Sequence, residues 1–434
     1  MEKIAIIGTG IAGLSAAHFL HKEYDITLFE KNNYVGGHTN TVTVDEDGTP
    51  VNIDTGFMVF NYATYPNLIR LFLELNVPTK KTSMTFSVQH VPSGLEFSGT
   101  GLNGLFAQRK NIFNPRYIGM LLQVNRFNEE CGEVLSDPRY AEMSLSEYVK
   151  EKKYGDDFLH KYLVPMSSAV WSTPIDMMMD FPAFSLIRFF TNHGFLGLKT
   201  QHQWYTVVNG SQAYREIMVE PFRSRIQIQS AVATVEREKD SAAVILENGR
   251  RTTFDKVIFA THADETLSMI VHPTEMERRL LSPFRYQENI ALLHTDESMM
   301  PKKKLAWSSW NYRIDKDRTG KLMPSTIYWM NSLQQVSQRK NYFVNINGET
   351  MVNPKYVIQR IVYTHPVFTV GTQRAQKELS KLNETGPFYY CGSYFKFGFH
   401  EDAFTSGLEL SRTLLKKKIW EESFTTETQR NRKY

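Results

Sequence analysis

The feature that most constrains the fold is a glycine-spaced turn at the start of the chain. Gly8, Gly10 and Gly13 follow an apolar run, residues 4–7, that predicts a buried parallel strand. In this spacing the first glycine permits a tight turn, the second lets backbone approach a pyrophosphate, and the third lets a helix pack on the strand. We expect that helix over residues 11–22, with its N-terminal amides and positive dipole end facing the phosphates. The turn therefore predicts an adenine dinucleotide site.

A second apolar run supports this prediction. Residues 25–29 read as the next strand, and Glu30 follows it where an acidic side chain can accept both hydroxyls of the adenosine ribose. A carboxylate there disfavours a 2'-phosphate. Strand, glycine triplet, helix, strand and acid occur in the order of a Rossmann-type unit, so the sequence predicts an α/β fold.

A second glycine pair distinguishes FAD from NAD. Gly36 and Gly37 follow Glu30 after one short loop, and NAD-binding folds have no need of such a pair. This stretch resembles the flavoprotein superfamily of flavin amine oxidases, phytoene desaturases and protoporphyrinogen oxidases, where the pair lets the loop run close to the FAD pyrophosphate. Many of these proteins carry Arg where this chain has His38, although a neutral imidazole can still donate one hydrogen bond.

Further segments match the same superfamily. The resemblance implies that the Asp54–Phe57 turn lies beside the flavin, although an ordinary turn with a helix cap is an alternative interpretation. It also implies that the backbone of Val232 contacts the adenine. The run 255–262 reads as a strand that returns to the sheet and ends near the pyrophosphate. Asn248 and Gly249 predict a hairpin before that strand.

The C-terminal part supplies the last strand and helix of the predicted FAD-binding domain. Residues 387–392 read as a buried strand, and a helix from Glu401 to about Lys418 would point its N-terminus at the flavin and stabilise negative charge on the reduced ring. Ser393 stands where relatives usually place Asp or Glu to hold the ribityl chain. Asp402 has two open interpretations, a flavin contact and the N-cap of this helix.

Together these motifs predict the fold class, the cofactor and its binding residues. We expect an α/β fold with a Rossmann-type FAD-binding domain (residues 1–80, 206–265 and 386–418), an inserted α+β substrate domain (81–205 and 266–385) and a tail (419–434). The predicted cofactor is FAD, and its predicted binding residues are Gly8, Gly10, Ile11, Ala12, Gly13, Glu30, Lys31, Gly36, Gly37, His38, Thr39, Asp54, Thr55, Gly56, Phe57, Val232, Ala260, Thr261, Gly392, Ser393, Asp402, Ala403 and Phe404.

The substrate region is rich in aromatic residues and Met, with helical spacing over residues 106–127 and 181–190. Such side chains suit a long apolar substrate, although they also fill ordinary cores. Phrases such as Pro165–Trp171, Trp307–Tyr312 and Phe397–Asp402 resemble a branch of FAD-dependent oxidoreductases often encoded beside cyclopropane-fatty-acyl-phospholipid synthases. That resemblance implies a role in modifying acyl chains.

The expected activity is hydride transfer between flavin N5 and a hydrophobic substrate, a fatty acyl chain. Three alternatives stay open: a flavin amine oxidase, a redox-neutral fatty acyl double-bond isomerase, and a non-catalytic flavin-bound partner of an acyl-modifying methyltransferase. Amine oxidation is disfavoured because residues 286–294, where amine oxidases commonly hold a Lys near flavin N5, contain none. His400 and Glu401 are the candidate acid or base, and each also has a structural interpretation. Weaker candidates are His193, Trp171, Asn311 and Tyr312.

Composition excludes several other classes. No apolar stretch reaches the roughly 20 residues of a spanning helix, so we expect a cytoplasmic protein. The net charge of +4 is spread along the chain, which does not suggest nucleic-acid binding. Its basic runs, Lys302–Lys304 and Lys416–Lys418, read as solvated faces, although the second can also touch anionic lipid. Cys131 and Cys391 are expected to be reduced, and the spacing of His18 and His21 is not taken as a metal site.

Overall fold

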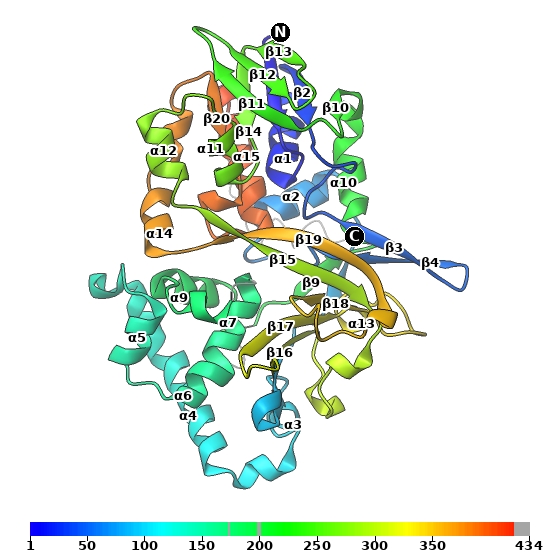
Figure 1. Ribbon diagram of the computed structural model, residues 1–434, viewed down its shortest axis with the longest axis vertical. Helices are drawn as coiled ribbons and strands as arrows, with labels where there is room; N and C mark the ends of the chain where they lie inside the picture. Colours follow the sequence, from blue (N-terminus) through cyan, green and yellow to red (C-terminus); the bar gives the residue numbers. More distant parts are fainter. Residues whose placement is uncertain (172–173, 198–200, 421–434) are drawn as a thin grey trace.

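The computed structural model describes residues 1–171, 174–197 and 201–420. In it, the glycine turn follows a strand of a parallel five-stranded sheet (Figure 1). The strands lie in the order β10 (Ile226–Gln227), β2 (Asp25–Phe29), β1 (Lys3–Ile7), β14 (Lys256–Phe259) and β20 (Phe388–Tyr390), all parallel. Segments far apart in the sequence thus complete one sheet, as the predicted α/β fold requires. Most of the predicted tail, residues 421–434, lies outside the described residues.

Helix α1 (Ile11–Leu20) connects β1 to β2 and packs against α15 (His400–Leu415). The two backbones approach closely at Gly407, where an added Cβ would lie 2.4 Å from the carbonyl oxygen of Ala12. Both helices are shorter at their C-terminal ends than the sequence suggests, which is usual because helix ends are the least certain part of such predictions.

A small antiparallel sheet adjoins the parallel one. It contains β11 (Val232–Arg237), β12 (Ala242–Leu246) and β13 (Arg251–Phe254), with the predicted hairpin between the last two. The strand predicted within residues 255–262 is present as β14 of the parallel sheet, whereas the residues before it, 252–254, belong to β13, so the chain changes sheets at Asp255. The side chain of Asp255 accepts a 2.6 Å hydrogen bond from the amide of Lys3, the first residue of β1, and so holds the chain where it changes sheets.

A mixed seven-stranded sheet forms the other half of the molecule. Its order is β19 (Val357–Val367), β15 (Arg285–His294), β18 (Phe343–Ile346), β17 (Leu322–Trp329), β16 (Trp310–Lys316), β7 (Phe86–His90) and β8 (Leu95–Ser98). The long antiparallel pair β15 and β19 forms the edge of this sheet that lies toward the parallel sheet (Figure 1). The predicted division into two domains with the stated boundaries stays a prediction.

A group of helices lies beside the mixed sheet (Figure 1). They are α3 (Leu102–Leu105), α4 (Pro115–Glu130), α5 (Leu145–Glu151), α6 (Asp156–Phe158), α7 (Val164–Trp171), α8 (Ile175–Met178) and α9 (Ala183–Asn192). The predicted helix over 106–127 begins only at Pro115, because Asn114 caps it by accepting from the amides of Arg116 and Tyr117.

The remaining elements lie around these sheets. The strands are β3 (Thr41–Glu46), β4 (Thr49–Asp54), β5 (Phe60–Asn61), β6 (Thr79–Thr82) and β9 (Trp204–Val207), and the helices are α2 (Pro66–Glu74), α10 (Gln212–Val219), α11 (Ala263–Met269), α12 (Glu275–Leu281), α13 (Met330–Leu333) and α14 (Val370–Gln376). Cys131 and Cys391 are buried and form no disulfide. None of the described helices has the length and apolar character needed to cross a bilayer.

Candidate cofactor and substrate site

A cavity of about 960 Å³ lies between the parallel sheet, the strands β15 and β19, and the start of α15. Most of the predicted FAD-binding residues line it, although they come from widely separated parts of the sequence. These lining residues are Gly8, Gly10, Ile11, Ala12, Glu30, Lys31, Gly36, Gly37, His38, Gly56, Phe57, Val232, Ala260, Thr261, Gly392, Ser393 and Ala403, together with the candidate catalytic residue His400. Their individual contacts with FAD stay predictions.

The two glycine turns lie against each other in the wall. A Cβ added to Gly8 would lie 2.9 Å from the carbonyl oxygen of Ala260. A Cβ added to Gly13 would lie 2.1 Å from the carbonyl oxygen of Gly8. At Gly10, the residue before α1, an added Cβ meets no protein atom within 4 Å, so this position opens onto space. Gly10 and Gly36 form a bridge that joins the two turns. The result is a cradle of bare backbone at a helix N-terminus, which fits a pyrophosphate.

Glu30 is buried at the end of β2 and lines the cavity. One carboxylate oxygen accepts from the amide and hydroxyl of Thr9, and the other accepts from the amide of Asn32 at 2.9 Å and its side chain at 2.8 Å. These contacts hold the carboxylate in one orientation, as ribose recognition requires. Lys31 instead forms an exposed ion pair with Glu265 at 2.6 Å.

Six predicted FAD-binding residues do not line the cavity: Gly13, Thr39, Asp54, Thr55, Asp402 and Phe404. Asp54 shows why. Its carboxylate accepts from the amide and hydroxyl of Ser211 and from the side chain of Gln334, behind the wall. Since Ser211 is the residue before α10, the alternative interpretation of a turn with a helix cap agrees with this geometry. Burial raises the pKa of this carboxyl.

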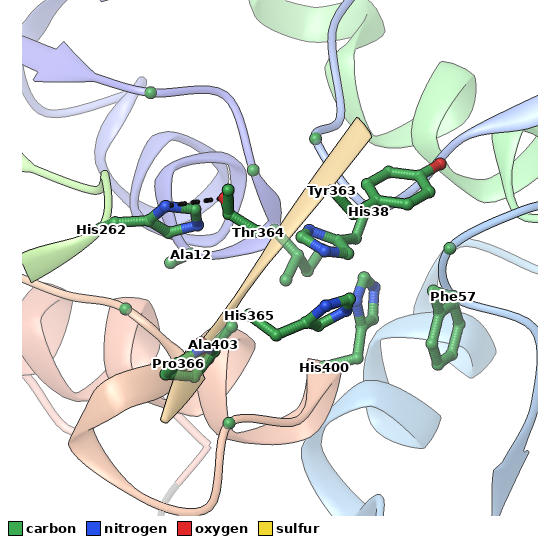
Figure 2. Close-up of a pocket in the computed structure, with 18 of the residues that line it drawn as sticks. Ala12, His38, Phe57, His262, Tyr363, Thr364, His365, Pro366, His400 and Ala403 are labelled. Atoms are coloured by element: carbon green, nitrogen blue, oxygen red, sulfur yellow. Dashed lines mark hydrogen bonds between the residues drawn. The ribbon is translucent and has the colours of Figure 1, made fainter. Parts of the chain in front are cut away.

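Four histidines, His38, His262, His365 and His400, gather along the cavity (Figure 2). Burial lowers the pKa of all of them, to about 4 for His365 and about 3 for His400, so they are neutral near pH 7. The Nε2 atom of His38 is buried and has no partner among the described residues. A buried polar atom without a partner costs about 1–3 kcal/mol. This unsatisfied atom in the wall fits a cofactor that carries polar groups.

His400 is held by a chain of hydroxyl groups. The hydroxyl of Tyr214 lies 2.8 Å from that of Thr39 and also contacts Nε2 of His400, whose ring stacks on Phe57 with 3.8 Å between centroids. Thr39 is buried, and its hydroxyl has no other partner in the described structure. If Thr39 donates to Tyr214 and Tyr214 donates to His400, every hydrogen is used. This direction places the His400 proton on Nδ1, the ring nitrogen left for the cavity.

Glu401 is not among the residues that line the large cavity, and its role as acid or base stays a prediction. Its carboxylate accepts from the amides of Asn67 at 3.0 Å and Leu68 at 2.9 Å, in the first turn of α2. Asp402 accepts from the amides of Phe397 and Phe399 and thereby caps α15 from its third residue. Burial raises the pKa of Glu401 to about 7 and that of Asp402 to about 6.

Both carboxyls line a neighbouring pocket of about 380 Å³. It shares Tyr65, His193 and Phe399 with the large cavity, so these side chains stand between the two spaces.

Beyond the glycine cradle the cavity becomes an aromatic chamber. Its walls come from α7, α9, β9, β16, β17 and the segment before α15, with the lining side chains Met58, Val59, Met84, Val170, Trp171, Phe189, His193, Phe195, Trp204, Trp310, Tyr328, Leu333, Phe368 and Phe399. Two of the weaker candidates, Trp171 and His193, line this chamber, whereas the buried Asn311 and Tyr312 do not. Among the described lining residues the only lysine is Lys31, at the ribose end.

Sequence reasoning assigned no role to His262, Tyr286, Tyr363 or His365, although all of them line the cavity. His262 follows β14, where a strand end near the pyrophosphate was expected, so its position offered a signal. Tyr363 and His365 lie on β19, which reaches the site only through tertiary packing, and no local pattern marks them.

A parallel sheet with a glycine cradle, a buried carboxylate at the end of its second strand and an adjoining aromatic chamber is the arrangement of dinucleotide-binding flavoproteins. The model of the family described as flavin containing amine oxidoreductase matches residues 11–299, more than half of the chain, and the chain belongs to this family. The predictions of an FAD cofactor and of membership in the flavin amine oxidase superfamily are thereby confirmed, as is that of the FAD-dependent oxidoreductase class.

Curated relatives match only parts of the chain. The 15-cis-phytoene desaturase of Arabidopsis thaliana is 26% identical over 294 residues, which cover 60% of this chain and 48% of that protein. The 1-hydroxycarotenoid 3,4-desaturase of a Flavobacterium species is 32% identical over 128 residues, 26% of this chain and 25% of that protein. The chain therefore spans about half or less of the length of these relatives.

Solved structures share the fold over nearly the whole chain. A putrescine oxidase bound to putrescine has a TM-score of 0.66 at 13% identity, and a fatty acid isomerase from P. acnes that produces CLA has 0.65 at 14%. Each alignment covers 96% of this chain and 99% of the other. At such identities the likeness shows the fold alone, and it agrees with the predicted α/β architecture.

Proposed function

We propose that this protein transfers hydride between flavin N5 and a carbon of a hydrophobic substrate, and that this substrate is a fatty acyl chain. The observation that carries the proposal is the aromatic chamber that continues from the glycine cradle and is lined by apolar side chains. Long apolar chains gain most from such a wall, because burial of each methylene contributes about 0.8 kcal/mol. The names of the relatives, carotenoid desaturases and a fatty acid isomerase, support a long apolar substrate.

The chain's own residues have three tasks at this site. The glycine cradle and the start of α1 bind phosphates, and Glu30 binds the ribose. The aromatic wall orients the substrate and excludes water. His400 holds a proton on Nδ1 and can donate a hydrogen bond to an acceptor in the cavity. When bound, FAD supplies the hydride chemistry.

We further propose, from the resemblance to the branch encoded beside cyclopropane-fatty-acyl-phospholipid synthases, that the acyl chain is one that an acyl-modifying methyltransferase also uses. The alternative is that this protein is a non-catalytic partner of that methyltransferase. It would be supported if the two proteins co-purify and no substrate reduces or reoxidises the flavin.

Anaerobic titration of the yellow protein tests the reaction class. We expect unsaturated phospholipids or acyl thioesters to change the flavin absorbance, whereas alkylamines leave it unchanged. Bleaching by amines with no response to lipids would establish amine oxidation and contradict the proposal. A rearranged double bond without net oxidation would identify an isomerase.

A pair of matched variants tests the chamber. Met84→Glu places a charge in the apolar wall, and Met276→Glu places the same charge on α12, where Met276 is 41% exposed. We expect the first to weaken lipid binding by about tenfold or more, since burying an unpaired polar group costs at least 1–3 kcal/mol. The second should leave lipid binding unchanged. Equal effects would indicate that the chamber does not hold the acyl chain.

A further inference from the structure

Large apolar side chains are exposed on one continuous segment, from α3 through the short helical turn at residues 109–113 to α4. Phe113 is 88% exposed, Leu102 75%, Leu122 66% and Ile112 46%. Helices α3 and α4 lie at the end of the molecule farthest from the parallel sheet (Figure 1). Exposed apolar side chains that cluster in this way mark interaction sites more often than chance exposure.

The same segment is basic. No Asp or Glu occurs between residues 97 and 128, which contain Arg109, Lys110, Arg116 and Arg126. Asp157 neutralises Arg116 and Glu130 neutralises Arg126. The guanidinium of Arg109 instead donates to the carbonyl of Phe106 and the side chain of Asn103, which carry no charge.

A second basic element adjoins α3. The helical turn Lys304–Ala306 packs against α3 and β8, and Lys302, Lys303 and Lys304 are all exposed, as is Leu305 at 52%. The nearby carboxylate of Glu96 is buried and accepts from the backbone amides of Lys302 and Lys303 at 2.9 Å. Within the described residues no carboxylate pairs with the side chains of these three lysines, Arg109 or Lys110.

We propose that this surface docks the protein on an anionic lipid membrane. We name it the basic apolar surface and define it by Leu102, Arg109, Lys110, Ile112, Phe113, Leu122 and Lys302–Leu305. Apolar side chains beside unpaired cations are the combination that binds an interface, because the former enter the acyl boundary while the latter meet anionic headgroups. Nucleic acid would use the cations and could stack a base on Phe113, but it would gain little from the aliphatic Leu102, Ile112, Leu122 and Leu305, which offer no ring for stacking.

The surface is connected to the chamber through its helical support. Helix α4 packs on α6, which leads through the turn at Leu159–Leu163 to α7, whose Val170 and Trp171 line the cavity. The proposal stands apart from the proposed function, since an enzyme acting on any substrate could dock in this way. Vesicle binding requires no turnover, so failure of either proposal can be recognised separately.

Co-sedimentation of the full-length, FAD-loaded protein with vesicles tests the surface. We expect binding to vesicles of equal parts phosphatidylcholine and phosphatidylglycerol, little binding to phosphatidylcholine alone, and loss at high salt. In K302Q/K303Q/K304Q the partition coefficient should fall about a hundredfold, since each cation contributes about a fivefold factor. F113S should lower it without changing its salt dependence.

Matched controls come from elsewhere in the chain. K416Q/K417Q/K418Q removes the other three-lysine run, and I217S removes an apolar side chain that is 40% exposed on α10. Both should bind anionic vesicles like the unaltered protein. Flavin absorbance and melting temperature show that each variant is folded. Absence of vesicle binding, equal losses in variants and controls, or capture of nucleic acid without vesicles would overturn the proposal.

Discussion

His400 owes its orientation to two hydroxyl groups that lie outside the cavity. The sequence predicted His400 near the flavin because it stands next to the predicted last helix, and the structure places it in the cavity wall. The sequence could not reveal the contact between His400 and Tyr214, because the two residues are 186 positions apart in the chain. Nor could it separate His400 from Glu401, because neighbours on a helix point about 100° apart and only tertiary packing decides which faces the cavity.

Tyr214→Phe tests the hydroxyl chain. Without the Tyr214 hydroxyl, Nε2 of His400 loses its donor, so both neutral tautomers should become populated. Loss of the buried partners should also lower stability by about 1–3 kcal/mol. Nitrogen chemical shifts of a His400 labelled with ¹⁵N report the tautomer, and denaturant unfolding reports stability. Tyr162→Phe is the control, because the Tyr162 hydroxyl has no hydrogen-bond partner among the described residues. If His400 carries its proton only on Nε2 in the unaltered protein, the proposed direction of donation from Thr39 through Tyr214 to His400 is wrong.

At the scale of elements, local patterns predicted what is local. β1, α1 and β2 follow within 30 residues, and their periodicity and glycine spacing sufficed. The pairing of β14 with β20 joins strands about 130 residues apart, so it could be expected only from the resemblance. The late start of α4 was missed because an Asn–Pro capping signal lay inside an apolar pattern of helical period.

Gly407→Ala tests the close contact between α1 and α15. The new methyl group would lie 2.4 Å from the carbonyl oxygen of Ala12 and 2.8 Å from Cβ of Ser15, so α1 and α15 must separate. We expect a loss of about 1–3 kcal/mol, as in other overpacked cores. The shift should also weaken FAD binding, which fluorescence titration measures, because both helix N-termini flank the cavity.

Gly119→Ala is the matched control within α4, since an added Cβ there meets nothing within 4 Å. It should stabilise the protein by about 0.5–1 kcal/mol through improved helix propensity. If both alanines shift the melting temperature in the same direction, the contact between α1 and α15 is not as tight as the structure indicates.

At the scale of the whole molecule, buried titratable groups determine how stability depends on pH. Burial lowers the pKa of eight histidines: His18, His38, His90, His193, His262, His294, His365 and His400. These groups take up protons near pH 6.5 in the unfolded chain but stay neutral in the folded one, so their stability contribution is lost as the pH falls. Glu401, Asp402 and Asp54 have raised pKa values and act in the opposite sense.

Because the histidines outnumber these carboxyls, the melting temperature should fall steadily from about pH 7 to about pH 5. Differential scanning calorimetry across this range measures it. Glu401→Gln should steepen the fall, because it removes a group that favours the folded state as the pH decreases through 7. A melting temperature that is flat or rises on acidification would show that the histidines are not held neutral.

The order of strands in the parallel sheet has a consequence for how the protein is made. β1 and β2 leave the ribosome before the other strands of this sheet. β14, the neighbour of β1, follows more than 220 residues later, and β20 lies near residue 390. During synthesis these two strands wait with both edges uncovered, because β10 and β14, their neighbours on either side, follow much later in the chain. Uncovered strand edges favour aggregation and chaperone capture. The pocket for the flavin is therefore complete only after the start of α15, which supplies His400 and Ala403 to the cavity wall, has been synthesised.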